Sequence, residues 1–252
     1  MRLDKRSAIV TGAGRGFGEG IATLFAAEGA RVACADIDGD SAARVADAIK
    51  SAGGEAIGLA CDVAVDADVA AMVEASVQAF GSVDIVVNNA GTTHKNQPLL
   101  NVDEAAFDRV FAVNVKSIFL SALHTVPVFR KQGHGVMINI ASTAGVRPRP
   151  GLVWYNATKG AVITATKSMA LELAPDKIRV VGVNPVAGDT PLLSSFLPGE
   201  DTPEIRRKFV DTIPLGRLST AADVAKTCLF LASDDAEFLT GVCIEVDGGR
   251  CV

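Results

Sequence analysis

The chain has 252 residues, of which 49 % are hydrophobic, so it holds enough apolar side chains for one large buried core. Its formal net charge is −5, which excludes the strongly basic surface that nucleic-acid binders present to phosphates. No linker-like stretch divides the sequence, and no continuous apolar run approaches the ~18–20 residues of a membrane helix. We therefore expect one domain over residues 1–252 whose partner is a small molecule, with no nucleic acid and no membrane.

The cysteines and histidines argue against disulfides and against a metal site. The five cysteines are odd in number, contain no C-x-x-C pair and lie mostly inside apolar runs, as small core residues do in a reducing compartment. His94, His124 and His134 are far apart in the sequence, and no H-E-x-x-H or Cys/His cluster accompanies them. The apolar run that precedes Thr11 is too short for a signal peptide. We expect a cytoplasmic protein without a bound metal.

Short β-branched runs alternate with longer segments of helical periodicity along the chain. The expected strands are residues 7–12, 31–36, 55–62, 83–89, 135–142, 178–185 and 242–249. Most of them are apolar at nearly every position, which indicates burial on both faces. The alternation predicts βαβ units with right-handed crossovers, and so a doubly wound, Rossmann-type α/β fold. We expect a mostly parallel seven-stranded sheet with helices on both faces, which binds its ligand beyond the carboxyl ends of the strands.

A glycine-rich turn, TGAGRGFG at residues 11–18, follows the first expected strand and opens the first expected helix. Its glycines, Gly12, Gly16 and Gly18, are spaced G-x-x-x-G-x-G, and Phe17 stands where the common G-x-G-x-x-G has its last glycine. Such a turn lets a pyrophosphate approach backbone N–H groups at a helix N-terminus. The pattern favours dinucleotide binding, although a purely structural turn has the same composition.

A carboxylate, Asp36, ends the second expected strand, 18 residues after Gly18. In dinucleotide-binding folds an acidic residue at this place accepts hydrogen bonds from the adenosine ribose, and its charge repels a 2′-phosphate. Arg15 in the glycine turn would attract that phosphate, but Ile37 adds no second cation beside Asp36. We therefore expect NAD as the cofactor, with NADP as the less favoured option. Without the glycine turn, Asp36 in DIDGD would be better interpreted as an ordinary turn residue.

The only tyrosine of the chain, Tyr155, stands four residues before Lys159 in a segment of helical periodicity. Residues at i and i+4 share one helix face, with Cβ atoms ~5–6 Å apart. The pKa of a free phenol is ~10, and a nearby ammonium lowers it by favouring the phenolate. The pair is therefore a candidate general acid and base. By itself, Y-x-x-x-K is also typical of helices in which the lysine is only a surface residue.

In combination, the glycine turn, NNAG at 88–91, Asn114, Ser142 and YNATK at 155–159 resemble the short-chain dehydrogenase/reductase family. The resemblance covers essentially the whole chain, with the motifs in the family's order and spacing. It implies that Tyr155 is the catalytic acid and base, and that Lys159 lowers the tyrosine pKa and binds the nicotinamide ribose. It also implies that Ser142 hydrogen-bonds the substrate oxygen, and that Asn114 interrupts its helix and holds a water on the proton path.

The same resemblance implies where the cofactor lies. Asp62 and Val63, after the third expected strand, match the pair around the adenine, and the NNAG turn passes beside the adenosine ribose. Residues 184–190, NPVAGDT, match a segment that usually reads N-P-G-x-V/I-x-T and grips the carboxamide, but Val186 replaces the usual glycine and Gly188 the usual β-branched residue. The residues expected to contact the cofactor are Gly12, Arg15, Gly16, Phe17, Gly18, Asp36, Ile37, Asp62, Val63, Asn89, Ala90, Gly91, Tyr155, Lys159, Pro185, Gly188 and Thr190.

These features predict an NAD(H)-dependent oxidoreductase that interconverts a secondary alcohol and a ketone. The nearer alternative is an NADPH-dependent 3-oxoacyl-carrier-protein reductase of the same family, which Asp36 and the net charge disfavour. A non-catalytic dinucleotide-binding sensor is a second alternative. It would not need the set of Asn114, Ser142, Tyr155 and Lys159.

The substrate end of the site has fewer signals. Residues 190–215 are too long for a simple connection and mix apolar with charged residues, which is typical of a lid over the substrate. Arg147 and Arg149 are candidates to meet an anionic group, although exposed loop arginines more often contact solvent or another subunit. His94 and Trp154 are further candidates for the edge of the pocket.

Assembly is expected from the resemblance, which implies a homo-oligomer, either a tetramer or a dimer. Ala157, Ala161 and Ala165 form a row of small residues on the helix that carries the tyrosine. Such a row allows close packing with a helix of another subunit, or with the chain's own sheet.

Overall fold

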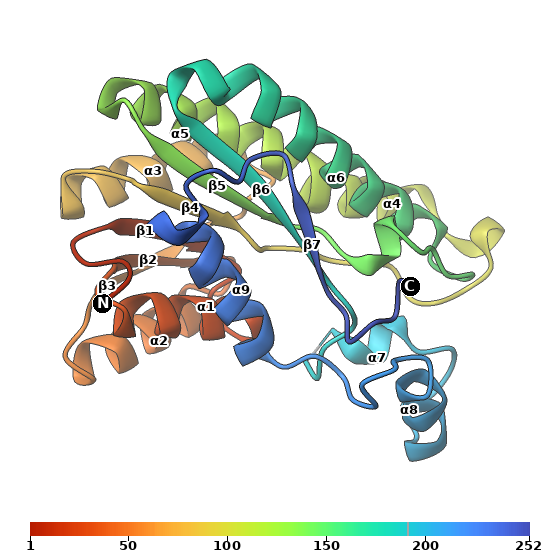
Figure 1. Cartoon of the computed structure of the whole chain (residues 1–252). Coiled ribbons are helices and arrows are strands. Elements are labelled where there is room, and N and C mark those ends of the chain that lie inside the picture. Colours follow the sequence, from red (N-terminus) through yellow and green to blue (C-terminus); the bar gives the residue numbers. More distant parts are fainter. Residues whose placement is uncertain (191) are drawn as a thin grey trace.

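The computed structural model describes residues 1–190 and 192–252, and seven strands in them form one sheet (Figure 1). The strand order is β3-β2-β1-β4-β5-β6-β7, and every pairing is parallel, so the mostly parallel sheet that we expected is parallel throughout. The strands are β1 (Ser7–Thr11), β2 (Arg31–Asp36), β3 (Glu55–Ala60), β4 (Ile85–Asn88), β5 (Gly135–Ile140), β6 (Ile178–Pro185) and β7 (Cys243–Val246).

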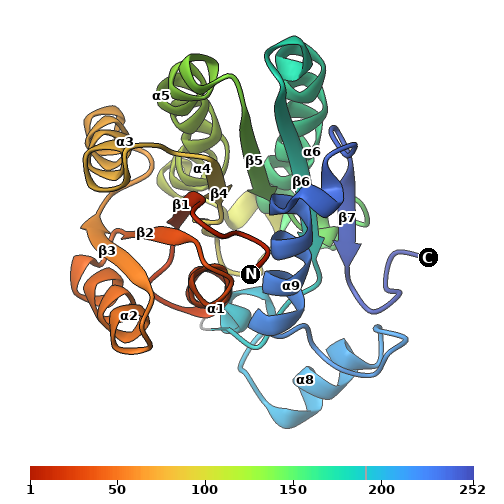
Figure 2. The same ribbon diagram turned by 60° about the vertical axis from the view of Figure 1, so that its left-hand side comes forward.

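The helices cover both faces of this sheet, which gives the three layers of a doubly wound fold (Figure 2). They are α1 (Gly16–Ala27), α2 (Gly39–Ser51), α3 (Asp66–Phe80), α4 (Glu104–Phe111), α5 (Ser117–Gln132), α6 (Val153–Leu173), α7 (Leu193–Phe196), α8 (Pro203–Val210) and α9 (Ala221–Ala232). Alternate residues of β1 point to opposite layers: Ala8 and Val10 pack with α1, α2 and α9, and Ile9 packs with α3, α5 and α6. Both faces are buried, which explains why the strands are apolar at consecutive positions.

The helix ends follow from local sequence. Asp38 and Asp103 accept hydrogen bonds from the first turns of α2 and α4, and Thr220 forms a capping box with Asp223 at the start of α9. At the other end, α3 and α5 stop at Gly81 and Gly133, which have φ values of 78° and 79°. Glycine tolerates this left-handed conformation without a Cβ clash.

Helices α4 and α5 and the π-helical turn between them form one continuous helical run, Glu104–Gln132. One 18-residue window of this run has a mean hydropathy of 1.3, so by length and composition alone it meets the criterion for a membrane span, which the sequence analysis did not expect. However, Leu120, Val126 and Phe129 of α5 are buried in the core cluster under the sheet. Packing on the sheet accounts for these three side chains.

Asp84 ties the beginnings of three neighbouring strands together. Its Oδ2 accepts hydrogen bonds from the backbone N–H and the hydroxyl of Ser7, at 2.7 and 2.9 Å, and its Oδ1 lies 2.8 Å from Nε2 of His134. Burial pushes the pKa of Asp84 up, but the hydrogen bonds from Ser7, His134 and Ser82 together hold it below its ordinary value of 3.8. The ionised carboxylate therefore stabilises the folded chain above that pH, and the contribution is lost as the pH falls through the lower folded pKa.

We expect Asp84→Ala to lower the free energy of unfolding by about 2–4 kcal/mol, because it leaves buried donors of Ser7 without an acceptor. Chemical denaturation at neutral pH measures the loss. Asp84→Asn keeps a side-chain carbonyl acceptor and should lie between the two proteins. An Asp84→Ala protein as stable as the parent would show that the network contributes no net stability.

Candidate active site

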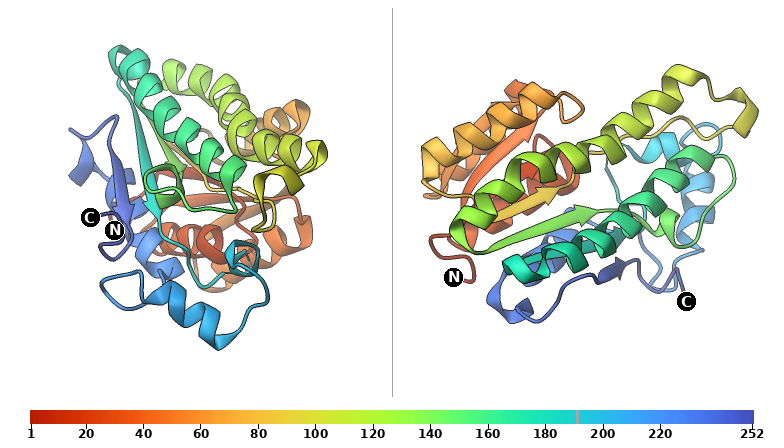
Figure 3. Two further views of the ribbon diagram at one scale, coloured as in Figure 1. Left: turned by 90° about the vertical axis from the view of Figure 1, so that its right-hand side faces the viewer. Right: turned by 90° about the horizontal axis from the view of Figure 1, so that it is seen from above.

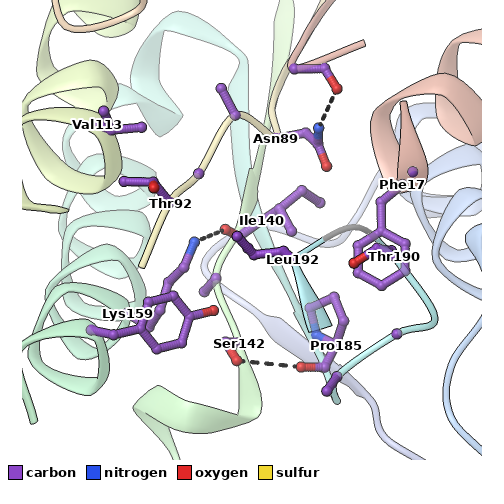
Figure 4. Close-up of a pocket in the computed structure, with 18 of the residues that line it drawn as sticks. Phe17, Asn89, Thr92, Val113, Ile140, Ser142, Lys159, Pro185, Thr190 and Leu192 are labelled. Atoms are coloured by element: carbon purple, nitrogen blue, oxygen red, sulfur yellow. Dashed lines mark hydrogen bonds between the residues drawn. The ribbon is translucent and has the colours of Figure 1, made fainter. Parts of the chain in front are cut away.

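A cavity of about 400 Å³ lies where the carboxyl ends of β1, β2, β4, β5 and β6 meet. Two predicted site residues, Gly18 and Asn114, do not line it, and all of the others do. Figure 4 shows the labelled residues converging on this cavity, among them Phe17, Asn89, Ser142, Lys159 and Thr190. The parallel sheet brings these distant motifs together because each follows the carboxyl end of a strand.

The glycines of the turn after β1 are required for different structural reasons. Gly12 and Gly16 have φ values of 63° and 61°, which non-glycine residues rarely adopt. A Cβ on Gly12 would lie 2.9 Å from Cα of Ala90, and one on Gly18 would lie 2.0 Å from the carbonyl oxygen of Gly12. Gly18 therefore allows α1 to pack against the turn instead of lining the cavity.

The unusual residues Phe17 and Gly188 are related by packing. Both residues depart from the common patterns, and in the structure a Cβ on Gly188 would lie 2.4 Å from Cζ of Phe17. Gly188 therefore makes room for the phenyl ring. Val186 is the other departure in this segment. It is buried in a cluster with three residues of the 190–215 segment, Leu193, Leu197 and Phe209.

The carboxylate of Asp36 lies at the adenosine end that the resemblance implies. Its Oδ2 accepts a hydrogen bond of 2.9 Å from the N–H of Gly14, and its Oδ1 accepts one of 3.0 Å from the N–H of Asp38. A carboxylate offers about four acceptor positions, so two remain for ligand hydroxyls. Arg15 and Ile37 line the same part of the cavity with exposed side chains, as the sequence predicts.

The turn after β4 is fastened to the glycine turn. The side-chain amide of Asn89 donates to the carbonyl oxygens of Thr11 at 2.8 Å and Gly12 at 3.2 Å, and the N–H of Ala90 donates to the Thr11 hydroxyl. The side-chain N–H groups of Asn89 are therefore used in hydrogen bonds within the protein. Asn89 shapes the cavity by holding the two loops together. Asp62 likewise uses one oxygen to accept from the N–H of Ala64.

Tyr155 and Lys159 share one face of α6, as their spacing predicts. Nζ of Lys159 lies 5.8 Å from the centre of the Tyr155 ring and donates a 2.9 Å hydrogen bond to the carbonyl oxygen of Ile140. Both side chains are buried, with exposed fractions of 6 % and 5 %. Ser142, in the loop after β5, faces the same cavity.

Asn114 sits in a π-helical turn, Ala112–Lys116, between α4 and α5. Its amide clamps the loop after β4, since Oδ1 accepts from the N–H of Thr92 and Nδ2 donates to the carbonyl oxygen of Thr92, both at 2.9 Å. Nδ2 also donates to the hydroxyl of Thr158 on α6. The helix is therefore interrupted at Asn114, and this residue connects α6 to the loop instead of lining the cavity.

Burial dominates the electrostatics of the candidate acid and base. It raises the pKa of Tyr155 above its ordinary value, while the Ser142 hydroxyl and the charge of Arg149 act in the opposite direction. Burial also lowers the pKa of Lys159 to about 8. The net shift of the tyrosine pKa is therefore upward, opposite to the expected lowering, because the loss of water around the phenolate is the larger effect.

Phe196 and Phe209, both in the segment 190–215 that was expected to cover the substrate, line the cavity. Arg250 lines it as well, and no local motif points to this residue. Arg149 lines it as well, whereas Arg147 does not. The other two candidates for the edge, His94 and Trp154, do not line it: His94 is buried elsewhere, and Trp154 packs on Phe107 with ring centres 5.2 Å apart.

Comparison with known proteins agrees with this geometry. A family model described as enoyl-(acyl carrier protein) reductase matches residues 12–250. The chain is 52 % identical to 4-formylbenzenesulfonate dehydrogenase from Comamonas testosteroni, over 99 % of both chains. It is 48 % identical to a crystal structure of 3-ketoacyl-(acyl-carrier-protein) reductase from Brucella melitensis complexed with NADH, with a TM-score of 0.92 and coverage of 99 % and 100 %.

A third similar protein is a 7α-hydroxysteroid dehydrogenase whose structure was solved with NADH and 7-oxo glycochenodeoxycholic acid. It is 36 % identical, with a TM-score of 0.93 over 98 % of this chain and 95 % of that one. The two solved structures share the fold of this chain, and the names of the three relatives specify different substrates. The chain belongs to the short-chain dehydrogenase/reductase family of oxidoreductases.

Proposed function

We propose that this enzyme uses NAD(H) to interconvert a secondary alcohol and a ketone, with Tyr155 as the general acid and base. The observation that carries the proposal is the single cavity that holds Tyr155, Lys159 and Ser142 together with the glycine turn and Asp36. The relative named for a formyl substrate adds aldehydes to the compounds worth assaying.

Two observations support the fit of a nicotinamide dinucleotide. The N-terminus of α1 opens at the cavity and has no side-chain cap, so its first N–H groups are free to meet a pyrophosphate. At the other end, the Lys159 ammonium donates one hydrogen bond to the protein and keeps two donors for ribose hydroxyls. Gly12, Gly16 and Asp36 would hold the adenosine half, and Lys159 with Thr190 the nicotinamide half.

When bound, the cofactor supplies or accepts a hydride at the substrate carbon. The proton is transferred by a side chain of the protein. During reduction Tyr155 donates its phenolic proton to the substrate oxygen, and during oxidation the phenolate accepts it. Ser142 donates a hydrogen bond to the same oxygen and stabilises its developing negative charge. We expect the ammonium of Lys159, 5.8 Å from the ring centre, to act in favour of the phenolate, while burial sets the net upward direction of the tyrosine pKa.

The alternative, an NADPH-dependent 3-oxoacyl-carrier-protein reductase, draws support from the name of the Brucella relative and from Arg15, although that relative was solved with NADH. Titration with NADH and with NADPH, followed by cofactor fluorescence, tests the choice, and turnover of secondary alcohols with NAD completes the test. Tighter NADPH binding would favour the alternative. Binding of the cofactor with no turnover of alcohols, ketones or aldehydes would favour a sensor.

We also propose that residues 190–215 act as a lid, of which residue 191 lies outside the described residues. Helices α7 and α8 lie beyond the carboxyl ends of β6 and β7 (Figure 1). From α7, Phe196 packs on Tyr155 with ring centres 5.1 Å apart, and from α8, Phe209 lines the cavity. Apolar contacts of this kind would exclude water from the site when substrate is bound.

A homo-oligomer is supported by an apolar face of α5 and α6, which run side by side over one face of the sheet (Figure 3). Phe119, Leu123 and Leu171 are exposed on these helices. Ala157 is exposed and Ala161 is partly exposed, so the small-residue row faces outward and not the chain's own sheet. This arrangement permits close packing with the same helices of a second copy.

We expect Phe119→Glu to shift the protein from a tetramer or dimer to a smaller species, because the substitution places a charge where an apolar contact forms. Sedimentation velocity measures the change. Leu100→Glu makes the same kind of change at an exposed residue outside α5 and α6 and should leave the assembly unaltered. An unchanged sedimentation coefficient for Phe119→Glu would exclude this face as the interface.

A further inference from the structure

Two arginines from distant parts of the chain meet at the substrate end of the cavity. Arg149 comes from the loop before α6 and Arg250 from the segment after β7, and both line the cavity. Both lie against the ring of Phe209: the guanidinium carbon is 4.4 Å from the ring centre for Arg149 and 5.7 Å for Arg250. Arg250 is 7 % exposed, and Arg149 is half-buried.

Neither guanidinium group forms a salt bridge in the part of the chain that the structure describes, and the carboxylate that acts on Arg250, that of Asp247, does so from beyond salt-bridge distance. Other arginines there, namely Arg2, Arg6, Arg44, Arg130, Arg206 and Arg217, pair with aspartate or glutamate. Arg250 donates to the Thr212 hydroxyl, and the Arg149 guanidinium donates to no protein acceptor among those residues. Burial and the charge of Arg250 lower the pKa of Arg149 to about 10. Holding two like charges together out of water costs free energy that a bound anion would offset.

The cations are close to the reacting groups. The charge of Arg149 acts on the Tyr155 phenol, and that of Tyr155 on Arg149. The space around them is lined by the apolar side chains of Val186, Leu192 and Phe196. A compact substrate that reaches Tyr155 with its carbonyl oxygen would therefore place its far end beside the two guanidinium groups.

We propose that Arg149 and Arg250 form an anion subsite, so that the enzyme acts on carbonyl compounds and alcohols that carry a sulfonate or carboxylate on a compact apolar body. The inference rests on the proposed function, since it names the substrate class of the same site. Guanidinium groups suit such anions because their planar donors match two oxygens at once. An acyl chain on a carrier protein has no charge at this position, so the subsite also argues against the carrier-protein reductase.

The test compares 4-acetylbenzenesulfonate with the neutral 4-(methylsulfonyl)acetophenone, which keeps the ring, the ketone and two sulfonyl oxygens. We expect the parent enzyme to reduce the anionic ketone with a kcat/KM at least ~10-fold higher. Arg149→Gln and Arg250→Gln should each lower kcat/KM for the anion by ~10-fold or more, mainly through KM, and change that for the neutral ketone by less than ~3-fold. Arg149→Lys, which keeps the charge, should restore part of the preference.

Arg207→Gln is the matched control, because Arg207 is exposed on α8 and does not line the cavity. This substitution removes the same charge and should alter kcat/KM neither for the anionic ketone nor for the neutral ketone. Equal losses for both ketones in the Arg149 and Arg250 variants would overturn the subsite, as would a parent enzyme without a preference for the anion. In both cases continued NADH-dependent reduction of the neutral ketone would leave the proposed function standing.

A failure of the proposed function gives a different pattern. If neither ketone is reduced, calorimetric titration with 4-acetylbenzenesulfonate still measures whether the subsite binds the anion. Binding to the parent protein that weakens in Arg149→Gln, and is unchanged in Arg207→Gln, would support the anion site without the reaction. Equal binding by all three proteins, or by none, would overturn it.

Discussion

Replacing Tyr155 with phenylalanine should lower kcat by about 10³-fold while leaving NADH affinity unchanged, because the substitution removes only the oxygen that moves the proton. The ring of Tyr155 packs on Phe196, so Tyr155→Phe keeps this contact and the fold. Rapid-mixing measurements of hydride transfer and a fluorescence titration with NADH separate the two effects. Turnover within ~10-fold of the parent enzyme would assign the proton transfer to another group.

The pH dependence follows from the burial of the same side chain. Because burial raises the pKa of Tyr155, the phenol that donates a proton in reduction persists to alkaline pH. The phenolate that oxidation needs forms only as the pH approaches that raised pKa. We expect kcat/KM for alcohol oxidation to rise with pH across the neutral and alkaline range, and kcat/KM for reduction to fall only at its alkaline end. The opposite slopes would contradict the assignment.

The second large effect concerns the choice of cofactor. We expect the parent enzyme to bind NADH about 100-fold more tightly than NADPH, since the Asp36 carboxylate repels a 2′-phosphate. Asp36→Asn should raise NADPH affinity by at least ~10-fold, because the charge is removed while an oxygen remains to accept the hydrogen bond from Gly14. Fluorescence titrations with both cofactors measure the ratio.

Two further variants test the cause of this preference. Ile37→Arg in the Asp36→Asn background adds a cation beside the 2′ position and should shift the preference further toward NADPH. Arg15→Gln should leave the NADH preference in place, because the argument assigns that preference to Asp36. If the parent enzyme instead binds NADPH more tightly, Arg15 outweighs Asp36 and the carrier-protein reductase becomes the better proposal.

The sequence was sufficient to predict the sheet and to predict that the candidate reacting groups lie together. The apolar strands predicted burial on both faces, and the carboxyl-end rule placed Gly12, Asp36, Ser142 and Tyr155 in one cavity, where the structure has them. These predictions succeeded because each depends on local periodicity or on spacing within one short segment. The departures at Phe17 and Gly188 were also visible in the sequence. Only their contact in space shows that one compensates for the other.

Other features depend on contacts between distant segments and on how far a side chain is removed from water, and no local sequence pattern contains this information. Arg250 and Phe209 reach the cavity from segments far from Tyr155, so their role follows only from the folded chain. Likewise, the spacing of Tyr155 and Lys159 predicted their shared helix face, but the direction of the tyrosine pKa depends on how completely the fold removes water from the phenol. The sequence by itself determined the fold and the family, and it singled out Tyr155 as the candidate proton donor. Tertiary structure decided which charges face the substrate, because burial and long-range contacts arise only when the whole chain packs.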